Sequence, residues 1–238
     1  MSDRSGTNAD GKMRVAVIGS TGDVGTGVVE HLLSRGHEVI AIGRDASKLE
    51  TWSRGLWPDG NEKLRCVAGS FADDHAASDV VDRVFDSGRL DAVVASINVA
   101  VAPTNPLDLD EQAFREISGA NLLPHIAAAR AFIPRLRRGS TYMAIGGGMA
   151  DLIFPGRLDA TLVQAALRGF FQHLAVEKNA SHIATRLVML YAMIRPRNEP
   201  LIDQRGWVDY SVAGGFICDV IERIAEFPSA IIRYPPKK

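Results

Sequence analysis

The chain has 238 residues, 46% of them hydrophobic, which is enough to bury a substantial core in one α/β domain. Its 27 basic and 28 acidic residues are interspersed and give a formal net charge of -1, so no basic face for nucleic acid or anionic lipid is indicated. A small molecule is therefore the expected ligand. Cys66 and Cys218 lie far apart without paired spacing, which predicts two buried free thiols and a reducing, cytoplasmic compartment.

The N-terminal residues 1–12 are polar and lack an apolar core, which predicts a disordered tail rather than a signal peptide. No later segment is apolar over the length that a membrane span requires. Residues 13–238 contain no internal repeat and no linker, so we expect a single domain. No group of His, Cys, Asp or Glu has the spacing of metal ligands.

A glycine-rich turn follows the first apolar run, which begins at Val15, and an amphipathic run leaves the turn. Gly19 permits a tight turn, Gly22 lets the backbone approach a pyrophosphate, and Gly25 lets the following helix pack closely on the strand. The helix N-terminus then faces the anion. The turn therefore predicts a dinucleotide site formed by Gly19, Ser20, Thr21, Gly22, Asp23, Val24 and Gly25.

The later elements continue the alternation of strand and helix. Strands are expected at 38–42, 63–68, 91–96, 140–145, 185–191 and 230–234, and helices at 28–34, 79–85, 160–178 and 212–225, with a loop or frayed helix at 51–61. A long helix to about residue 137, distorted near Pro124, is predicted to begin with a capping box of Asp108 and Glu111. This order predicts a three-layer, Rossmann-like, doubly wound parallel β-sheet in a single α/β domain.

The pattern resembles the short-chain dehydrogenase/reductase family from about Met13 to Tyr234, and the glycine spacing is that of the family's extended and atypical branches. The resemblance places Arg44 after the second strand, where family members that use NADP often carry a basic residue. Members that use NAD commonly carry an acid one position earlier, where this chain has Gly43. A guanidinium can bond a 2'-phosphate, so NADP(H) is the expected cofactor; the alternative is a solvated surface arginine.

Further cofactor contacts are implied by the resemblance. Ser70 and Phe71 occupy the place after the third strand where the family holds the adenine, although the family's Asp is replaced by Ser. Ser96 and Asn98 follow the fourth strand, beside the expected ribose, where Asn98 could instead be a turn residue that caps its own backbone. Asn121 matches the family's active-site Asn, which holds a proton-relay water.

The catalytic residues of the family are missing. The resemblance places Ala160 at the catalytic Tyr and Gln164 at the catalytic Lys, and the expected Ser falls within Gly146, Gly147 and Gly148. Ala160 has no proton to donate, whereas Gln164 can still bond the nicotinamide ribose but carries no charge. The chain looks like a member of an atypical subgroup that combines a short chain with a small-residue stretch in place of Tyr and Lys.

Replacement chemistry is expected at the carboxyl ends of the strands. Tyr191, at the end of the sixth strand, is the first candidate for a substitute phenol, against the alternative of a tyrosine packed at the sheet end. Asp151 and Asp159 are expected to be solvated, and His125 and His173 to serve the core or an interface. An apolar or aromatic ligand is indicated by Met149, Leu152, Ile153, Phe154, Met193 and Trp207.

Three functions therefore remain open. The first is an atypical NADP(H)-dependent oxidoreductase that reduces an activated carbonyl, enone or imine, with a proton from Tyr191, water or the substrate. The second is an inactive NADP-binding or partner protein, and the third is a non-redox isomerase or cyclase that uses the same pocket. The resemblance also implies a homo-dimer or homo-tetramer formed through the helices 110–137 and 160–178.

Overall fold

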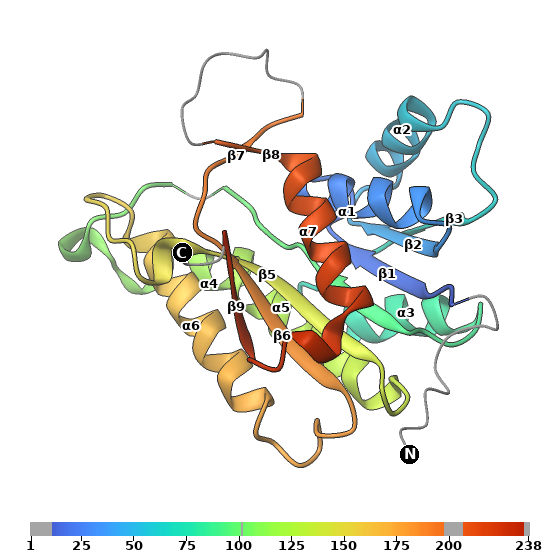
Figure 1. Ribbon diagram of the computed structural model, residues 1–238. Coiled ribbons are helices and arrows are strands. Elements are labelled where there is room, and N and C mark those ends of the chain that lie inside the picture. Colours follow the sequence, from blue (N-terminus) through green and yellow to red (C-terminus); the bar gives the residue numbers. More distant parts are fainter. Residues whose placement is uncertain (1–10, 101, 198–206, 236–238) are drawn as a thin grey trace.

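A computed structural model describes residues 11–100, 102–197 and 207–235 (Figure 1). In this part of the chain a seven-stranded sheet has the order β3-β2-β1-β4-β5-β6-β9, and each neighbouring pair is parallel. The strands are β1 (Arg14–Ile18), β2 (Glu38–Gly43), β3 (Leu64–Ala68), β4 (Ala92–Ala95), β5 (Thr141–Gly147), β6 (Ala184–Leu190) and β9 (Ile231–Tyr234). The predicted single α/β domain with a doubly wound parallel sheet is confirmed.

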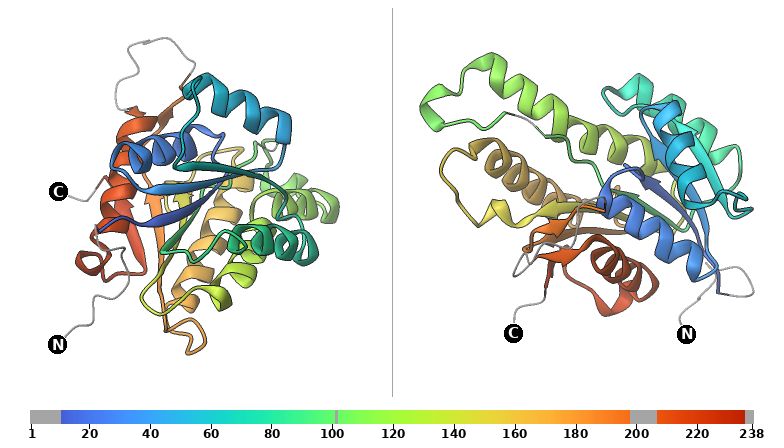
Figure 2. Two further views of the ribbon diagram at one scale, coloured as in Figure 1. Left: turned by 90° about the vertical axis from the view of Figure 1, so that its right-hand side faces the viewer. Right: turned by 90° about the horizontal axis from the view of Figure 1, so that it is seen from above.

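Helices cover both faces of the sheet (Figure 2). One face packs against α1 (Asp23–Ser34), α2 (Ala46–Leu56) and α7 (Tyr210–Glu222). The other packs against α3 (Asp74–Phe85), α5 (Leu123–Phe132) and α6 (Leu158–Leu174), and α4 (Glu111–Asn121) leads into α5. Two short strands, β7 (Ile194–Arg195) and β8 (Val208–Asp209), pair with each other outside the main sheet and are too short to show a period in the sequence.

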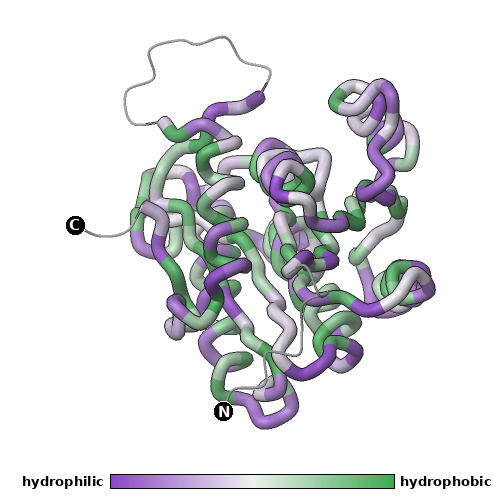
Figure 3. Tube along the Cα trace, turned by 45° about the vertical axis from the view of Figure 1, so that its right-hand side comes forward, coloured by the Kyte–Doolittle hydropathy of each residue, from purple (hydrophilic) through white to green (hydrophobic). Residues whose placement is uncertain are grey.

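Each central strand is buried on both faces, which is why the strands appear in the sequence as uninterrupted apolar runs. Val15 and Val17 enter the core on the α1 side, whereas Ala16 and Ile18 enter the core on the α3 side. Along the outer helices hydrophobic and hydrophilic stretches alternate (Figure 3), as expected for helices with one buried face. The carboxyl ends of the strands are thereby fixed relative to one another.

Two helix predictions need correction. The cap of α4 is Asp110, whose carboxylate accepts the N–H of Ala113, and Asp108 lies in a preceding 3-10 turn. Because both residues are acidic and each has an acidic neighbour within the next three positions, the sequence did not distinguish them. The predicted distortion near Pro124 is a break at Leu122, where α4 ends and α5 begins, since proline lacks an N–H and disfavours a preceding helical residue.

Segment 51–61 was expected to be a loop or frayed helix, and its first part belongs to α2, which begins after Asp45. The Asp45 carboxylate accepts the N–H of Lys48 and so caps this helix. Trp52 is buried on the inner side of α2, and its indole N–H donates to the Thr26 hydroxyl at 2.9 Å. Helix α2 is thus attached to α1 close to the glycine turn.

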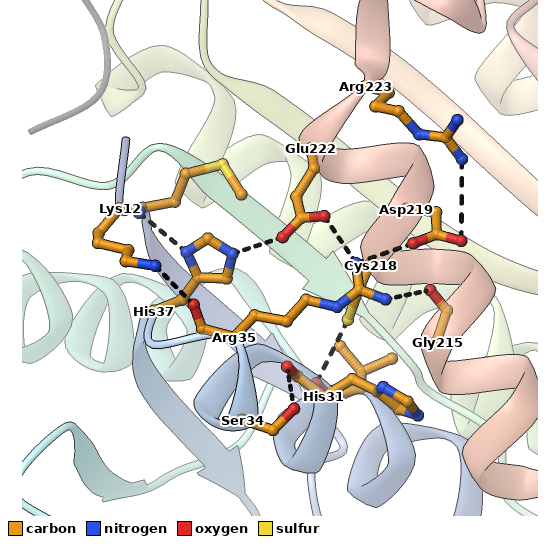
Figure 4. A network of polar contacts seen from close by, with 12 residues as sticks. Lys12, His31, Ser34, Arg35, His37, Gly215, Cys218, Asp219, Glu222 and Arg223 are labelled. Atoms are coloured by element: carbon orange, nitrogen blue, oxygen red, sulfur yellow. Dashed lines mark hydrogen bonds and ion pairs between the residues drawn. The ribbon is translucent and has the colours of Figure 1, made fainter. Parts of the chain in front are cut away.

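Helices α1 and α7 lie side by side and approach closely at two glycines. A methyl group on Gly214 would lie 2.3 Å from the backbone carbon of Gly27. Beyond this contact a polar network joins the end of α1 to α7 (Figure 4): Arg35 pairs with Glu222, and the buried His37 also contacts Glu222 at 2.8 Å. This network lies at the opposite end of the strands from the glycine turn and serves the packing.

Cys218 is buried, as expected, and its thiol donates to the carbonyl of Val28. Cys66 is exposed, so that part of the thiol prediction is wrong. It lies on β3, the edge strand of the sheet, which within the described residues pairs only with β2 and is covered incompletely. Residues 1–10 of the predicted N-terminal tail lie outside the described residues. Of the remaining two tail residues, Lys12 donates a hydrogen bond to the carbonyl of Arg35. No described helix is long and apolar enough to cross a membrane.

Candidate functional site

The glycine turn is held tightly between two strands. Gly19 has a φ of +75°, and a methyl group there would lie 2.0 Å from the carbonyl oxygen of Ser96, at the end of β4. A methyl group on Gly25 would lie 2.2 Å from the carbonyl oxygen of Gly19. Only glycine fits at these two positions, so the turn brings backbone N–H groups to the N-terminus of α1, where an anion is favoured.

A cavity of about 220 Å³ lies beside this turn, at the carboxyl ends of β1, β2, β3 and β4. It sits where the strand order reverses between β1 and β4, the usual ligand crevice of a doubly wound sheet. Eight of the residues that the sequence assigned to the cofactor line it: Gly19, Thr21, Gly22, Arg44, Ser70, Phe71, Ser96 and Asn98. The other lining residues include Lys48, Ile97, Val99, Gly119, Ala120 and Pro124.

Some of the predicted contacts lie outside the cavity. The Ser20 hydroxyl is fully buried and donates to the carbonyl of Ile42, so it is not free to contact a phosphate. The Asp23 carboxylate accepts the backbone N–H of Arg197 at 3.1 Å, and Val24 packs its side chain on the core. Gly25 packs against the backbone of Gly19 and Ser20 from the α1 side of the turn. These residues shape the turn, and Thr21 supplies the hydroxyl at its surface.

Phe71 lies 4% exposed with its ring against Phe132, so it forms a wall of the cavity from the core side. Ser70 uses its hydroxyl to accept the N–H of Ala72, which fixes the turn after β3. Both residues follow β3 after Gly69, and they close the end of the cavity where the resemblance expects the adenine.

Two cations line the cavity, although the sequence indicated only one. Arg44 follows β2 and is exposed, and Lys48 lies one turn into α2. None of the described lining residues is acidic. Lys48 was missed because α2 was not recognised; its signal is the cap residue Asp45, three positions earlier. The N-terminus of α1 and two cations, with no acidic residue in the described lining, fit the phosphates of a dinucleotide and favour an additional phosphate group.

Asn121 and His125 hold the loop that follows β4. The Asn121 side chain accepts the N–H of Val99 at 2.6 Å and donates to its carbonyl at 2.9 Å. His125 is 1% exposed and contacts the carbonyl of Ile97 at 3.1 Å, and burial lowers its pKa to about 4. Both side chains bond the loop from the core side, so in this structure they position residues of the cavity wall. His173 is exposed on α6, so it is not a core residue.

Gln164 packs against the glycines at the end of β5. Gln164 on α6 accepts the N–H of Gly147, at the end of β5, with its Oε1 at 2.6 Å. A methyl group on Gly146 would lie 2.8 Å from the same oxygen, and one on Gly148 would lie 2.7 Å from the Tyr191 ring. Gln164 does not line the cavity described above but lies at the end of β5, the next strand along the same sheet edge.

The Tyr191 hydroxyl donates to the carboxylate of Asp151, which also pairs with Arg168 and with Arg233 at 3.1 Å. The Arg233 guanidinium lies 4.0 Å from the Tyr191 ring centre. Burial and the Asp151 carboxylate raise the pKa of Tyr191, whereas the Tyr191 hydroxyl and Arg168 lower that of Asp151. The Tyr191 hydroxyl proton is therefore hydrogen-bonded to a carboxylate, and Tyr191 does not line the cavity. Both observations weigh against the prediction that Tyr191 replaces the family's catalytic phenol.

Asp159 was expected to be solvated, and it is 1% exposed. Arg157 bonds both of its oxygens, at 3.0 and 3.1 Å, at the start of α6, so the ion pair allows the carboxylate to be buried. The predicted apolar set near these residues is largely open to solvent: Leu152, Ile153, Phe154 and Met193 are 44%, 70%, 54% and 60% exposed. In the described part of the chain no cluster of His, Cys, Asp and Glu could hold a metal ion.

Comparison with solved structures agrees with this fold. A short-chain dehydrogenase from Burkholderia cenocepacia J2315, in complex with NADP, superimposes with a TM-score of 0.78 at 18% identity, over 94% of this chain and 96% of that one. An apo short-chain oxidoreductase from Pseudomonas aeruginosa PAO1, described as containing an atypical catalytic center, superimposes with a TM-score of 0.80 at 15% identity, over 93% and 95% of the two chains.

Comparison with known sequences gives the family. The short-chain dehydrogenase/reductase iacG of Pestalotiopsis fici is 32% identical over 149 residues, which cover 60% of this chain but only 59% of that relative. The family model for short chain dehydrogenase matches residues 13–200, the greater part of the chain. With the parallel sheet, the glycine turn and the cavity beside it, this match shows that the chain belongs to the short-chain dehydrogenase family.

Proposed function

We propose that the protein is an atypical NADP(H)-dependent oxidoreductase of this family, which reduces a small, apolar or aromatic acceptor. The observation that carries the proposal is the cavity beside the glycine turn, whose described lining includes Arg44 and Lys48 but no acidic residue. A bound NADPH supplies hydride at the carboxyl ends of the strands. The turn from Gly19 to Gly22 would hold its pyrophosphate, and the two cations its 2'-phosphate.

The acceptor is inferred from what the chain lacks and from what it exposes. At the positions of the family's acid and base stand Ala160 and Gln164, neither of which titrates near neutral pH. An acceptor that is already activated needs less help from an acid. The exposed side chains of Leu152, Ile153 and Phe154 lie beyond the end of β5, and they favour an apolar ligand.

Calorimetric titration with NADPH and, separately, NADH tests the cofactor assignment. Because Arg44 is exposed and Lys48 provides a second cation, we expect Arg44→Ala to weaken NADPH binding by about 10-fold and the double variant with Lys48→Ala by about 100-fold, at about 1.5 kcal/mol per charged hydrogen bond. NADH binding should change little. Arg54→Ala, on the same helix but outside the cavity, is the matched control. Equal losses for both nucleotides would contradict the assignment.

The loss of all three catalytic side chains favours a second candidate, a protein that binds NADP without turnover. Stopped-flow measurement of hydride transfer to a panel of enones, quinones and imines separates the two candidates. Consumption of one NADPH per product supports the oxidoreductase, whereas tight binding with no transfer across the panel supports the inactive binding protein. Intact mass of the product detects the non-redox isomerase or cyclase, whose product keeps the mass of its substrate or changes it by water alone.

A homo-dimer or homo-tetramer is part of the same proposal. Phe114 on α4 and Leu123 at the start of α5 are each 49% exposed, on the helices that the resemblance assigns to subunit contacts. Large apolar side chains at this exposure on adjoining helices favour an interface. Light scattering of the purified protein measures its mass directly, and a monomer at micromolar concentration would contradict this part of the proposal.

A further inference from the structure

Gln164 has a fixed amide orientation. Its Oε1 accepts the N–H of Gly147 at 2.6 Å, and only an amide oxygen can do so. The oxygen sits in the space left by Gly146, where a methyl group would lie 2.8 Å away. The amide nitrogen must therefore point the other way, and it forms no hydrogen bond with any described residue. Gln164 thus directs its N–H donors away from Gly147.

The neighbouring polar groups are already engaged. Asp151 is held by Tyr191, Arg168 and Arg233. Both the oxygen and the nitrogen of the Asn121 amide are hydrogen-bonded to Val99 in the loop after β4. Gln164 lies at the end of β5, one strand beyond the cavity, at the sheet edge where the acceptor is expected. The Gln164 amide nitrogen is therefore a neutral hydrogen-bond donor that α6 brings to this edge.

We propose that the Gln164 amide N–H donates to the oxygen of an enone and stabilises the negative charge that develops there. The inference rests on the proposed NADPH-dependent reduction. In reduction of an enone, hydride adds to the β-carbon, the π electrons move to the oxygen as an enolate, and water then protonates the α-carbon. The oxygen carries charge between these steps but needs no proton, so an amide donor is sufficient.

The same donor disfavours an isolated ketone. Reduction of an isolated ketone leaves an alkoxide that must be protonated at oxygen, and an amide N–H is far too weak an acid to do this. The orientation of Gln164 at Gly147 therefore favours an oxygen acceptor in conjugation with a double bond over an isolated ketone.

Binding of 4-nitrophenolate, an aromatic mimic of an enolate, tests the donor without turnover. Its absorbance would be titrated with and without NADP⁺ for wild type, Gln164→Glu, Gln164→Met and the control Gln172→Glu, which makes the same change at an exposed site of α6. Gln164→Glu can still accept the Gly147 N–H but presents an anion, so we expect binding at least 100-fold weaker. Gln164→Met should lose about 10-fold, and Gln172→Glu less than two-fold.

The outcomes separate this inference from the proposed function. Wild type that does not bind the phenolate, or Gln164 variants that bind it equally well, would overturn the role of Gln164. Absence of NADPH binding by wild type would instead overturn the proposed function, and the phenolate titration without nucleotide would still decide on the donor. As a second measurement, NADPH oxidation with 2-cyclohexenone should exceed that with cyclohexanone at least 100-fold in wild type, and equal rates would contradict the substrate class.

Discussion

A single methyl group at Gly25 should disrupt the nucleotide site. Gly25 lies in the first turn of α1, and the added Cβ would lie 2.2 Å from the oxygen and 2.9 Å from the carbon of the Gly19 carbonyl. Ordinary contact begins at 3.4 Å, so the two backbones must separate by about 1.2 Å from their distance of 2.2 Å. Gly19 cannot retreat, because Ser96 blocks its other side. The turn must therefore change its shape.

The magnitude follows from two opposing effects. Alanine favours a helix over glycine by about 1 kcal/mol, whereas overpacking against fixed backbone costs about 1–3 kcal/mol. We expect Gly25→Ala to lower the free energy of unfolding by up to about 2 kcal/mol, which is a fall in Tm of up to roughly 8 °C for a domain of this size. Displacement of the N–H groups by about 1 Å should weaken NADPH binding by about 100-fold.

Urea unfolding and calorimetry with NADPH measure the two effects separately. Gly169→Ala is the matched control, because Gly169 lies in α6 and a methyl group there meets no atom within 4 Å. We expect this control to raise stability by up to about 1 kcal/mol and to leave NADPH affinity unchanged. Gly25→Ala that binds NADPH as tightly as wild type would refute the argument that the turn is wedged between Ser96 and α1.

Three further outcomes follow from burial. His125 has a pKa of about 4 in the folded chain, below its usual 6.5, so the unfolded chain binds more protons between these values. The free energy of unfolding should therefore fall by about 3 kcal/mol as pH drops from 6.5 to 4, and urea titration of His125→Phe should show a shallower fall. With a thiol reagent, Cys66 should react in the native protein and Cys218 only after unfolding, since burial raises the pKa of Cys218 to about 12. Gly214→Ala should lower Tm by several degrees, measured by calorimetry, because the methyl would meet α1 backbone at 2.3 Å.

The sequence predicted correctly those elements whose pattern lies within one continuous segment. The glycine turn from Gly19 to Gly25 and the apolar strands are local patterns, and the cavity gathers residues that follow four different strands. Predictions of burial failed where the exposure of a side chain depends on contacts with residues of other elements. The exposure of Cys66 depends on the edge position of β3, and the burial of Asp159 depends on Arg157. Lys48 joins the cavity through a helix whose start was not recognised.

The end of β5 shows how two other elements constrain a run of glycines. A methyl group on Gly146 would lie 2.8 Å from the Gln164 amide oxygen, and one on Gly148 would lie 2.7 Å from the Tyr191 ring, whereas at Gly147 the nearest Gln164 atom is 3.7 Å from an added methyl. Movement of the flexible Gln164 side chain would relieve the contact at Gly146. At Gly148 the Tyr191 backbone also lies 3.1 Å away, so a side chain there would require the chain after β6 to shift. The glycine run, the glutamine and the tyrosine therefore form one packed arrangement, in which a change at one position affects the others.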